Sequence, residues 1–339
     1  MTLLNSLNLP SIKKSDCFIK FYLMSKIKSL IKKLKAFDIV VISFSFFLIS
    51  LHIIFNSKID NSVNWILINF VVITIAFVIS YLEAITENKV WRIIHYWYIA
   101  PIILLTFRQL FFMVKPIRVY DYDDWFIAID RWMFGTDPTQ FLYQFAHPVL
   151  TEILQIVYGM FYLLPIILCL SLLKKDRFLA LDFALFSVIY GFFLSYLGYF
   201  SLPGIGPRFT LHDFNTINQA LPGLYFTNYL REMTNTGEGI PFGTLNPAAV
   251  VQRDVFPSGH TMITLIVMYL SVRLKSRGRY FFIPIGTLLI FSTVYLWYHY
   301  VIDLIGGLVF AVVSMWSGKL FFNWWRKKIG KDIFEYEKH

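Results

Sequence analysis

Charged residues are scarce in this chain of 339 residues. Asp, Glu, Lys and Arg together make up 15% of it, whereas apolar residues make up 57% and the mean hydropathy is +0.59. A soluble domain needs a charged surface, so this composition excludes an ordinary soluble protein. We therefore expect an all-α polytopic membrane protein, in which the 35 Phe and nine Trp suit lipid-facing helices and membrane interfaces.

Cysteine and metal-ligand clusters are also scarce. Cys17 lies in a basic segment and Cys169 inside an apolar run, so the two are too far apart in predicted depth to pair. No His-x-x-x-His pair occurs, and the cysteines are isolated. We therefore predict no metal site and no cofactor.

Eight apolar runs are long enough to cross about 30 Å of hydrocarbon as helices. They cover residues 37–56, 64–83, 93–114, 149–173, 178–201, 257–274, 280–298 and 301–322. The last two runs nearly meet at Tyr298-His299-Tyr300, which predicts a very tight turn. The sequence thus predicts about eight transmembrane helices.

The positions of Lys and Arg predict the orientation. Basic residues cluster within the first 35 residues and at 174–177, 273–279 and 326–328. With eight spans, these segments share the cytoplasmic side with both termini. The loops 115–148 and 202–256 then lie on the opposite side with His299. The absence of an Asn-x-Ser/Thr sequon there favours a bacterial cytoplasmic membrane, with the site facing the periplasm or exterior, over a Golgi membrane with a lumenal site.

The basic N-terminal segment leaves two interpretations open. Residues 20–35 interleave lysines with Leu, Ile and Phe, which predicts either an amphipathic helix on an anionic leaflet or a plain topology-setting flank. No small-residue cleavage site follows a short apolar core, so we expect no signal peptide. The formal net charge is +10, but no compact basic domain is present to bind nucleic acid.

The sixth apolar run opens with the sequence Phe-Pro-Ser-Gly-His-Thr at 256–261. We expect Pro257 in the first turn of a helix, where its missing N–H has no consequence. Ser258 and Gly259 then offer backbone N–H groups to a phosphate oxygen at the positive end of the helix dipole. His260 is placed to protonate a departing alkoxide.

The eighth run contains the second half of the predicted site. His299 and Asp303 are four residues apart, which on a helix puts them on one face and lets the carboxylate fix the imidazole tautomer. Gly306 and Gly307 follow, and would let a neighbouring helix pack closely. A buried aspartate in an apolar run needs a partner, so we predict that His260, His299 and Asp303 act together in phosphoryl transfer.

The two motifs resemble the second and third signature motifs of the type 2 phosphatidic acid phosphatase (PAP2) superfamily. This resemblance implies that His299 is the nucleophile, Asp303 its orienting partner and His260 the acid. It also implies a six-helix catalytic core after two extra helices. The expected units are a basic interfacial segment at 1–35, two extra transmembrane helices at 36–89, the core at 90–322 with extracytoplasmic loops at 115–148 and 202–256, and a cytoplasmic tail at 323–339.

Departures from the family motifs bear on the substrate. Arg208 matches the first-motif arginine, but Ser201 stands at the lysine position, and Thr293 replaces the third-motif arginine. A phosphate monoester carries nearly two negative charges at neutral pH and a diester carries one. A site with one of three cations therefore suits a diester better, unless Arg253 or Lys115 compensates.

The third motif, at 295–303, is similar to that of inositol phosphorylceramide synthases and sphingomyelin synthases, as is the segment 129–135. The resemblance implies a phosphotransferase that moves a head group, with phosphoinositol expected, from a phosphatidylinositol-like glycerophospholipid to a ceramide-like alcohol. The resemblance further implies a phosphohistidine intermediate and the release of diacylglycerol. Its partners are thus membrane lipids, and Tyr298 is a possible further substrate contact.

Two alternatives remain open. One is a PAP2-type phosphatase that hydrolyses a phosphatidate-like or isoprenyl-phosphate-like lipid. The other is a transporter or lipid-binding scaffold, in which intramembrane Glu152, Asp182 and Arg108 line a pathway instead of bonding between helices. The 202–256 loop either selects the head group or is simply solvated.

Overall fold

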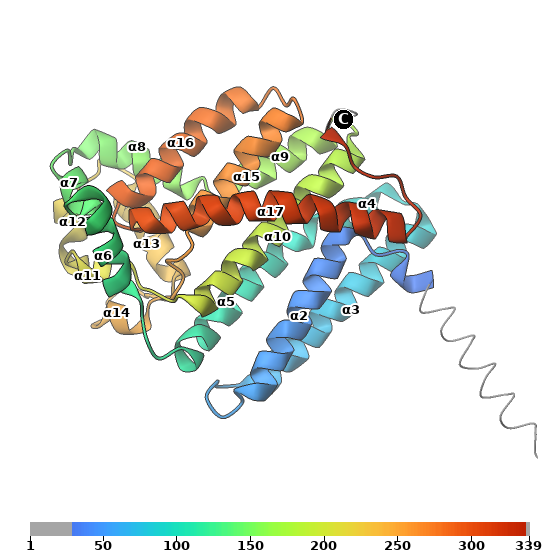
Figure 1. The fold of residues 1–339 in the computed structure, drawn as a ribbon, viewed down its shortest axis with the longest axis horizontal. Coiled ribbons are helices and arrows are strands. Elements are labelled where there is room, and N and C mark those ends of the chain that lie inside the picture. Colours follow the sequence, from blue (N-terminus) through green and yellow to red (C-terminus); the bar gives the residue numbers. More distant parts are fainter. Residues whose placement is uncertain (1–28, 337–339) are drawn as a thin grey trace, which may run out of the picture.

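The computed structural model describes residues 29–336, and every regular element within them is a helix (Figure 1). Each of the eight predicted apolar runs coincides with one helix or with a pair of consecutive helices. They are α2 (Ala36–Ile54), α3 (Ser62–Thr86), α4 (Lys89–Trp97) with α5 (Ile99–Ile117), α8 (Pro148–Gly159) with α9 (Leu163–Leu173), α10 (Phe178–Ser201), α15 (Gly259–Arg273), α16 (Arg279–Tyr295) and α17 (Val301–Lys328). The all-α membrane architecture is confirmed, whereas most of the segment 20–35 lies outside the described residues.

Fewer of these units have full spanning length than the sequence predicts. Among the described residues, five are long and apolar enough to cross a membrane, and α8 with α9 makes a sixth if the pair counts as one span bent by 53°. The expectation of one continuous helix over 149–173 is wrong. Pro165 lacks an N–H and would clash with the carbonyl of Phe161 in a continuous helix, so the chain breaks at 160–162. Helices α15 and α16 have only 15 and 17 residues.

Helix α10 is the central element of the described fold. It packs against α2, α5, α9, α15 and α17. Two thirds of the residues in an apolar 18-residue stretch of this helix are buried. Gly198 allows α15 to begin against it, because a Cβ at this position would lie 2.1 Å from Cδ of Pro257. The start of α15 is therefore held close to the end of α10.

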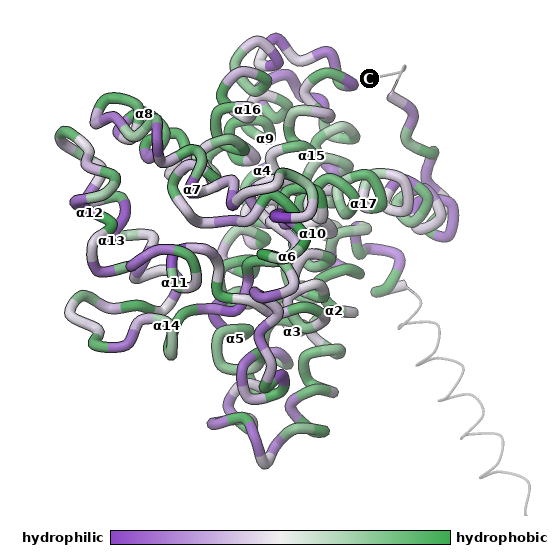
Figure 2. The backbone as a smooth tube through the Cα atoms, turned by 60° about the vertical axis from the view of Figure 1, so that its left-hand side comes forward, coloured by the Kyte–Doolittle hydropathy of each residue, from purple (hydrophilic) through white to green (hydrophobic). Residues whose placement is uncertain are grey.

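The remaining short helices gather together at the left of Figure 1. They are α6 (Asp123–Phe134), α7 (Pro138–Tyr143), α11 (Pro207–Thr210), a 3₁₀ turn at Phe214–Thr216, α12 (Ile217–Ala220), α13 (Thr227–Gly237) and α14 (Pro247–Val250). The backbone N–H of Tyr122 donates to the carbonyl of Pro203 at 2.8 Å, which joins the 115–148 and 202–256 loops. Figure 2 shows that polar residues are frequent here, whereas the long helices are mostly apolar. The two loops therefore contact each other, whereas their common side of the membrane stays a prediction.

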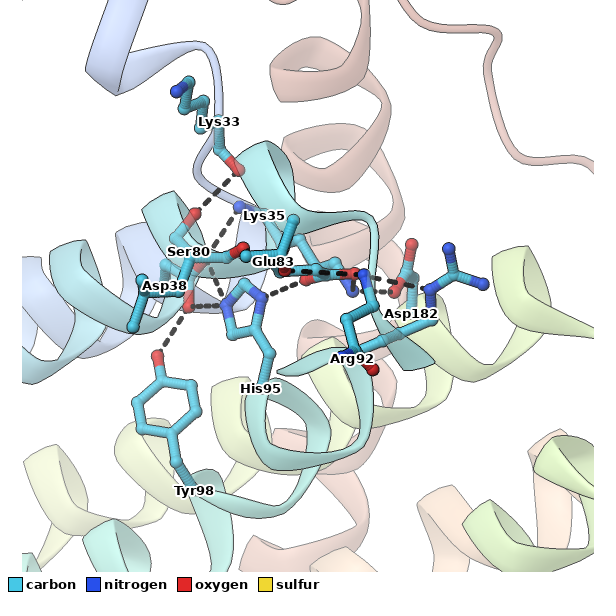
Figure 3. A network of polar contacts seen from close by, with 12 residues as sticks. Lys33, Lys35, Asp38, Ser80, Glu83, Arg92, His95, Tyr98 and Asp182 are labelled. Carbon is cyan, nitrogen blue, oxygen red and sulfur yellow. Dashed lines mark hydrogen bonds and ion pairs between the residues drawn. The ribbon is translucent and has the colours of Figure 1, made fainter. Parts of the chain in front are cut away.

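A polar network ties α2 and α3 to the rest of the fold (Figure 3). His95 on α4 is fully buried between Asp38 on α2 and Glu83 on α3, and its Nε2 lies 2.9 Å from Oδ1 of Asp38. The hydroxyl of Tyr98 donates to the same Oδ1 at 2.5 Å. Lys35 adds ion pairs to Glu83 at 3.2 Å and to Asp182 on α10 at 3.4 Å. Four helices therefore meet in one cluster of paired charges.

Replacement of Asp38 by alanine is expected to destabilise the protein by about 3 kcal/mol, because it leaves His95 and Tyr98 without their shared buried acceptor. A thermal-shift measurement in detergent should show a clear drop in melting temperature. Ser50→Ala on the same helix removes only an exposed hydroxyl that bonds to the carbonyl of Phe46. This control should change stability by less than about 0.5 kcal/mol, and an equal loss in both variants would contradict the assigned role of the network.

Candidate active site

His260 lies at the start of α15. Ser258 is the N-cap residue, and its Oγ accepts the N–H of Thr261 at 3.2 Å. Pro257 thus precedes the cap, and the expectation that it occupies the first turn is wrong by two positions. The reason is that serine satisfies the free N–H groups of a helix start and proline does not. Gly259 and His260 become the first two helical residues, and both line the main cavity.

His299 and Asp303 meet, but not as two residues on one helix face. His299 lies in the turn between α16 and α17, and Tyr300 is the N-cap residue of α17. Asp303 is the third residue of that helix, and its Oδ2 accepts the N–H of Tyr300 at 2.8 Å. The same oxygen lies 3.3 Å from Nδ1 of His299. Because a carboxylate only accepts hydrogen bonds, this contact assigns the proton to Nδ1 and leaves the Nε2 lone pair free.

The two helix starts bring the histidines together. A Cβ at Gly307 would lie 2.8 Å from the carbonyl oxygen of Ser258, so glycine permits the close approach of α17 to α15 that the sequence predicts. The Ser258 N–H also donates to the carbonyl of Asp303 at 3.0 Å. As a result, the ring centroids of His260 and His299 are 5.7 Å apart, and both rings line one cavity of about 420 Å³. This volume suits a small-molecule site.

Arg208 on α11 lines the same cavity and is almost completely buried. Its guanidinium carbon lies 4.2 Å from the ring centroid of Tyr298, which also lines the cavity. One amino group donates to Asn235 at 3.1 Å and the other is paired with Glu238, whereas Nε has no partner among the described residues. The predicted cation is therefore in place and has one donor available, but a carboxylate shares its charge.

Three other residues that the sequence suggests as substrate contacts do not line the cavity, namely Ser258, Arg253 and Lys115. The N–H of Ser258 is already bonded to Asp303, so Gly259 and His260 are the backbone donors nearest the cavity. Arg253 is bonded to Asp121 and to backbone carbonyls, the shortest being that of Val251 at 2.6 Å. Lys115 donates to the carbonyl of Ala249. Neither outer-loop cation compensates for the missing motif cations.

Two aspartates of α6 support the site from outside. Asp130 accepts the N–H groups of Val301 and Ile302 at 2.8 and 2.9 Å, which fixes the start of α17. Asp123 accepts the N–H of Gly206 at 2.8 Å and the hydroxyl of Tyr300 at 2.9 Å. No motif identifies either residue in the sequence, because a contact across 171 residues leaves no local signal.

The 202–256 loop closes over the cavity through α13. Glu152 on α8 anchors this helix by accepting the N–H groups of Leu224 at 2.9 Å and Phe226 at 2.6 Å and the hydroxyl of Thr227 at 2.6 Å. Glu152 thus forms hydrogen bonds between α8 and the start of α13, and Asp182 pairs with Lys35. Neither residue lines the cavity. Four α13 residues do line it, namely Leu230, Met233, Thr234 and Gly237.

Asp254 is a cavity residue that no motif identified. It lines the cavity with Glu238, and burial together with the nearby Glu238 raises its pKa to about 8. Asp254 is therefore mostly protonated at neutral pH. His299 is affected in the opposite sense, because burial and the neighbouring His260 and Arg208 lower its pKa well below the ordinary value. At neutral pH its imidazole is uncharged, as a nucleophile requires.

These shifts predict a pH effect on substrate binding. Above pH 8 Asp254 ionises and adds a negative charge to the cavity, which repels an anionic substrate by about 1 to 2 kcal/mol across roughly 10 Å. KM should therefore rise about tenfold between pH 7 and pH 9. Asp254→Asn should abolish this rise, whereas Asp213→Asn, the same change at an exposed position, should preserve it. Equal pH profiles for wild type and Asp254→Asn would exclude this role.

A family model described as "PAP2 superfamily" matches residues 124–317, more than half of the chain. The match contains Arg208, His260, His299 and Asp303. The chain belongs to the PAP2 superfamily. Searches of curated proteins and of solved structures gave no significant match.

PAP2 membership indicates phosphatase or phosphotransferase chemistry on lipids in an integral membrane protein. Helices α2 to α5 precede the matched region, so the PAP2 match begins at α6. Within residues 29–336, no three His, Cys, Asp or Glu side chains are grouped as metal ligands. The candidate groups for the chemistry are the two histidines, Asp303, Arg208 and the first N–H groups of α15.

Proposed function

We propose that this PAP2 protein is a lipid phosphotransferase of the inositol phosphorylceramide synthase type. It moves a phospho-head group, with phosphoinositol as the expected group, from a glycerophospholipid to a ceramide-like alcohol. The observation that carries the proposal is the charge of the cavity. Arg208 is the one buried cation lining it among the described residues, and Glu238 is paired with it. A singly charged phosphodiester suits this balance better than a doubly charged monoester.

The first step breaks the bond between phosphorus and the diacylglycerol oxygen. Nε2 of His299 attacks the phosphorus and forms a phosphohistidine, while Asp303 stabilises the imidazolium that develops. Arg208 Nε and the N–H groups at the start of α15 hold the charge on the phosphoryl oxygens. Burial and the nearby Arg208 lower the pKa of His260 to about 3 before the substrate binds. The step therefore requires that the bound phosphate anion stabilises protonated His260, which takes up its proton from solvent when the substrate binds. His260 then gives this proton to the departing alkoxide, and diacylglycerol leaves.

The second step reverses these roles. His260 removes the proton of an acceptor hydroxyl, whose oxygen attacks the phosphorus and releases His299. The cavity favours a lipid alcohol over water at this stage, because aromatic and aliphatic side chains form most of its wall. His260 itself lies between Tyr158 and Phe161, with ring centroids at 4.5 and 4.1 Å. Exclusion of water protects a reactive intermediate from hydrolysis.

The proposal is tested by offering purified protein two substrate sets in mixed micelles. One set contains phosphatidylinositol with a fluorescent ceramide, and the other contains phosphatidate alone. We expect a charged fluorescent product and diacylglycerol from the first set, and neither with His299→Ala. Rapid release of inorganic phosphate from phosphatidate, with no transfer product, would identify a phosphatase and reject the transferase.

A further inference from the structure

Arg108 is an intramembrane cation without a counter-charge among residues 29–336. It lies in the span Lys89–Ile117, nine residues before the end of α5 at Ile117. At 1.5 Å per residue, its Cα is about 13 Å from that end. The side chain is exposed, and its guanidinium carbon lies 4.7 and 5.0 Å from the ring centroids of Phe111 and Phe112. A charge at such a position is costly and marks a functional site by default.

The location of Arg108 connects it to the catalytic cavity. Arg108 lines that cavity together with Leu104 and Phe107 of the same helix. Its side chain is exposed and belongs to a segment of membrane-spanning length, so an opening of the cavity at Arg108 would face lipid. Arg208, by contrast, is buried beside the histidines. The cavity thus has one cation at its mouth and one at its reacting end.

A second cavity, of about 240 Å³, begins where the first one ends. Leu104, Tyr162 and Phe192 line both, so the two spaces adjoin. The second cavity lies between α4–α5, α9 and α10, and its wall is almost entirely apolar. Along α10 it extends from Phe192 to Leu181, a distance of about 16 Å by helical rise. This shape accommodates an extended hydrocarbon chain.

We propose that Arg108 binds the phosphate-bearing head of a lipid substrate at the membrane-facing mouth, while one hydrocarbon chain of that lipid occupies the apolar cavity between α5, α9 and α10. The proposal rests on the proposed function, since it concerns the same catalytic cavity. The anionic head group of the lipid would contact Arg108, and its apolar chain would extend along the second cavity toward Leu181. The substrate then reaches His299 sideways from the membrane.

Binding is tested without turnover by using a phosphonate analogue of phosphatidylinositol that carries a diazirine at the end of one acyl chain. Irradiation should label residues that line the apolar cavity, such as Cys169, Leu181 and Leu185. Arg108→Gln should reduce this labelling about tenfold, because a charge-assisted contact is lost. Arg108→Lys should retain most of it. Arg118→Gln removes a cation that bonds to Tyr122 and Ser201 and does not line either cavity, so it should have no effect.

Chain occupancy is tested by filling the cavity. Cys169→Phe places a ring in it, whereas Leu170→Phe adds the same ring at an exposed position one residue along α9. Cys169→Phe should raise KM about tenfold for long-chain substrates and leave short-chain substrates unaffected. Leu170→Phe should change neither. Activity on short chains shows that the variant folds, and an equal loss for both chain lengths would overturn the chain assignment.

The two proposals can fail separately. If the labelled lipid binds through Arg108 but no phosphate ester is turned over, the proposed function fails and the lipid site stands. If turnover occurs while Arg108→Gln leaves KM and labelling unchanged, the lipid site fails and the proposed function stands. Labelling confined to exposed residues such as Ile167 or Leu197 would also overturn the site.

Discussion

Replacement of His299 by alanine is expected to lower kcat by roughly 10⁴-fold or more, as the loss of a nucleophile does in other enzymes. The residual site cannot substitute for it, because His260 has no carboxylate partner among the described residues to hold its tautomer. KM should change little, since Arg208 and the first N–H groups of α15 remain. Steady-state kinetics on the substrate that wild type accepts measures both constants.

His147→Ala is the matched control for this experiment. His147 is an exposed imidazole at the N-cap of α8 and does not line the cavity. Its replacement removes a helix cap but no cavity group, so it should lower stability by about 1 kcal/mol and leave kcat within about threefold of wild type. Comparable losses in the two variants, or retention of activity by His299→Ala, would show that the nucleophile lies elsewhere.

Asp303→Asn is expected to lower kcat by about 10³- to 10⁴-fold, on the scale seen when a catalytic histidine loses its orienting carboxylate. One oxygen of Asp303 contacts both the N–H of Tyr300 and Nδ1 of His299, and in asparagine a neutral amide oxygen would take its place. The negative charge that stabilises the imidazolium during attack would then be lost. The pH profile of kcat/KM should change together with kcat, because no carboxylate faces the imidazole of His299 in the variant.

Asp130→Asn separates this positioning role from a purely structural one. Asp130 also accepts N–H groups at the start of α17, but it does not contact the His299 ring. We expect it to lower thermal stability while kcat falls by less than about tenfold. If Asp130→Asn lowered kcat as much as Asp303→Asn, the shared cause would be loss of the helix start and not loss of the imidazole partner.

The membrane class and the contact between His299 and Asp303 could be predicted from the sequence, because both depend on local patterns. Apolar runs identify helices by length, and a histidine beside a helix start identifies an anion site. The geometry of the contact differs from the predicted one. His299 and Asp303 were expected on one helix face, yet the helix begins at Val301 and the contact is made across its N-cap. The expected contact between the two side chains still forms, because capping and helical spacing both bring a residue near the one four positions later.

Long-range contacts explain what the sequence could not predict. Glu238 shares the charge of Arg208 from thirty residues away, and Asp254 enters the cavity without belonging to a recognisable motif. Hydrogen bonding between helices is one expectation for Arg108, but among the described residues its side chain contacts the rings of Phe111 and Phe112 and forms no ion pair. Each of these depends on how α5, α13 and α15 are packed, and no local periodicity encodes that packing.

The central claim is that His299 carries the phosphoryl group between donor and acceptor, with His260 moving the proton. It is tested most directly with His260→Ala and a p-nitrophenyl phosphodiester, whose leaving group needs no acid. Rapid-quench kinetics should then show a burst of p-nitrophenol, because His299 still attacks while the later step lacks its base. Mass spectrometry of the quenched protein should place the phosphoryl adduct on His299. Release of p-nitrophenol with no adduct, or an adduct on any other residue, would contradict the account.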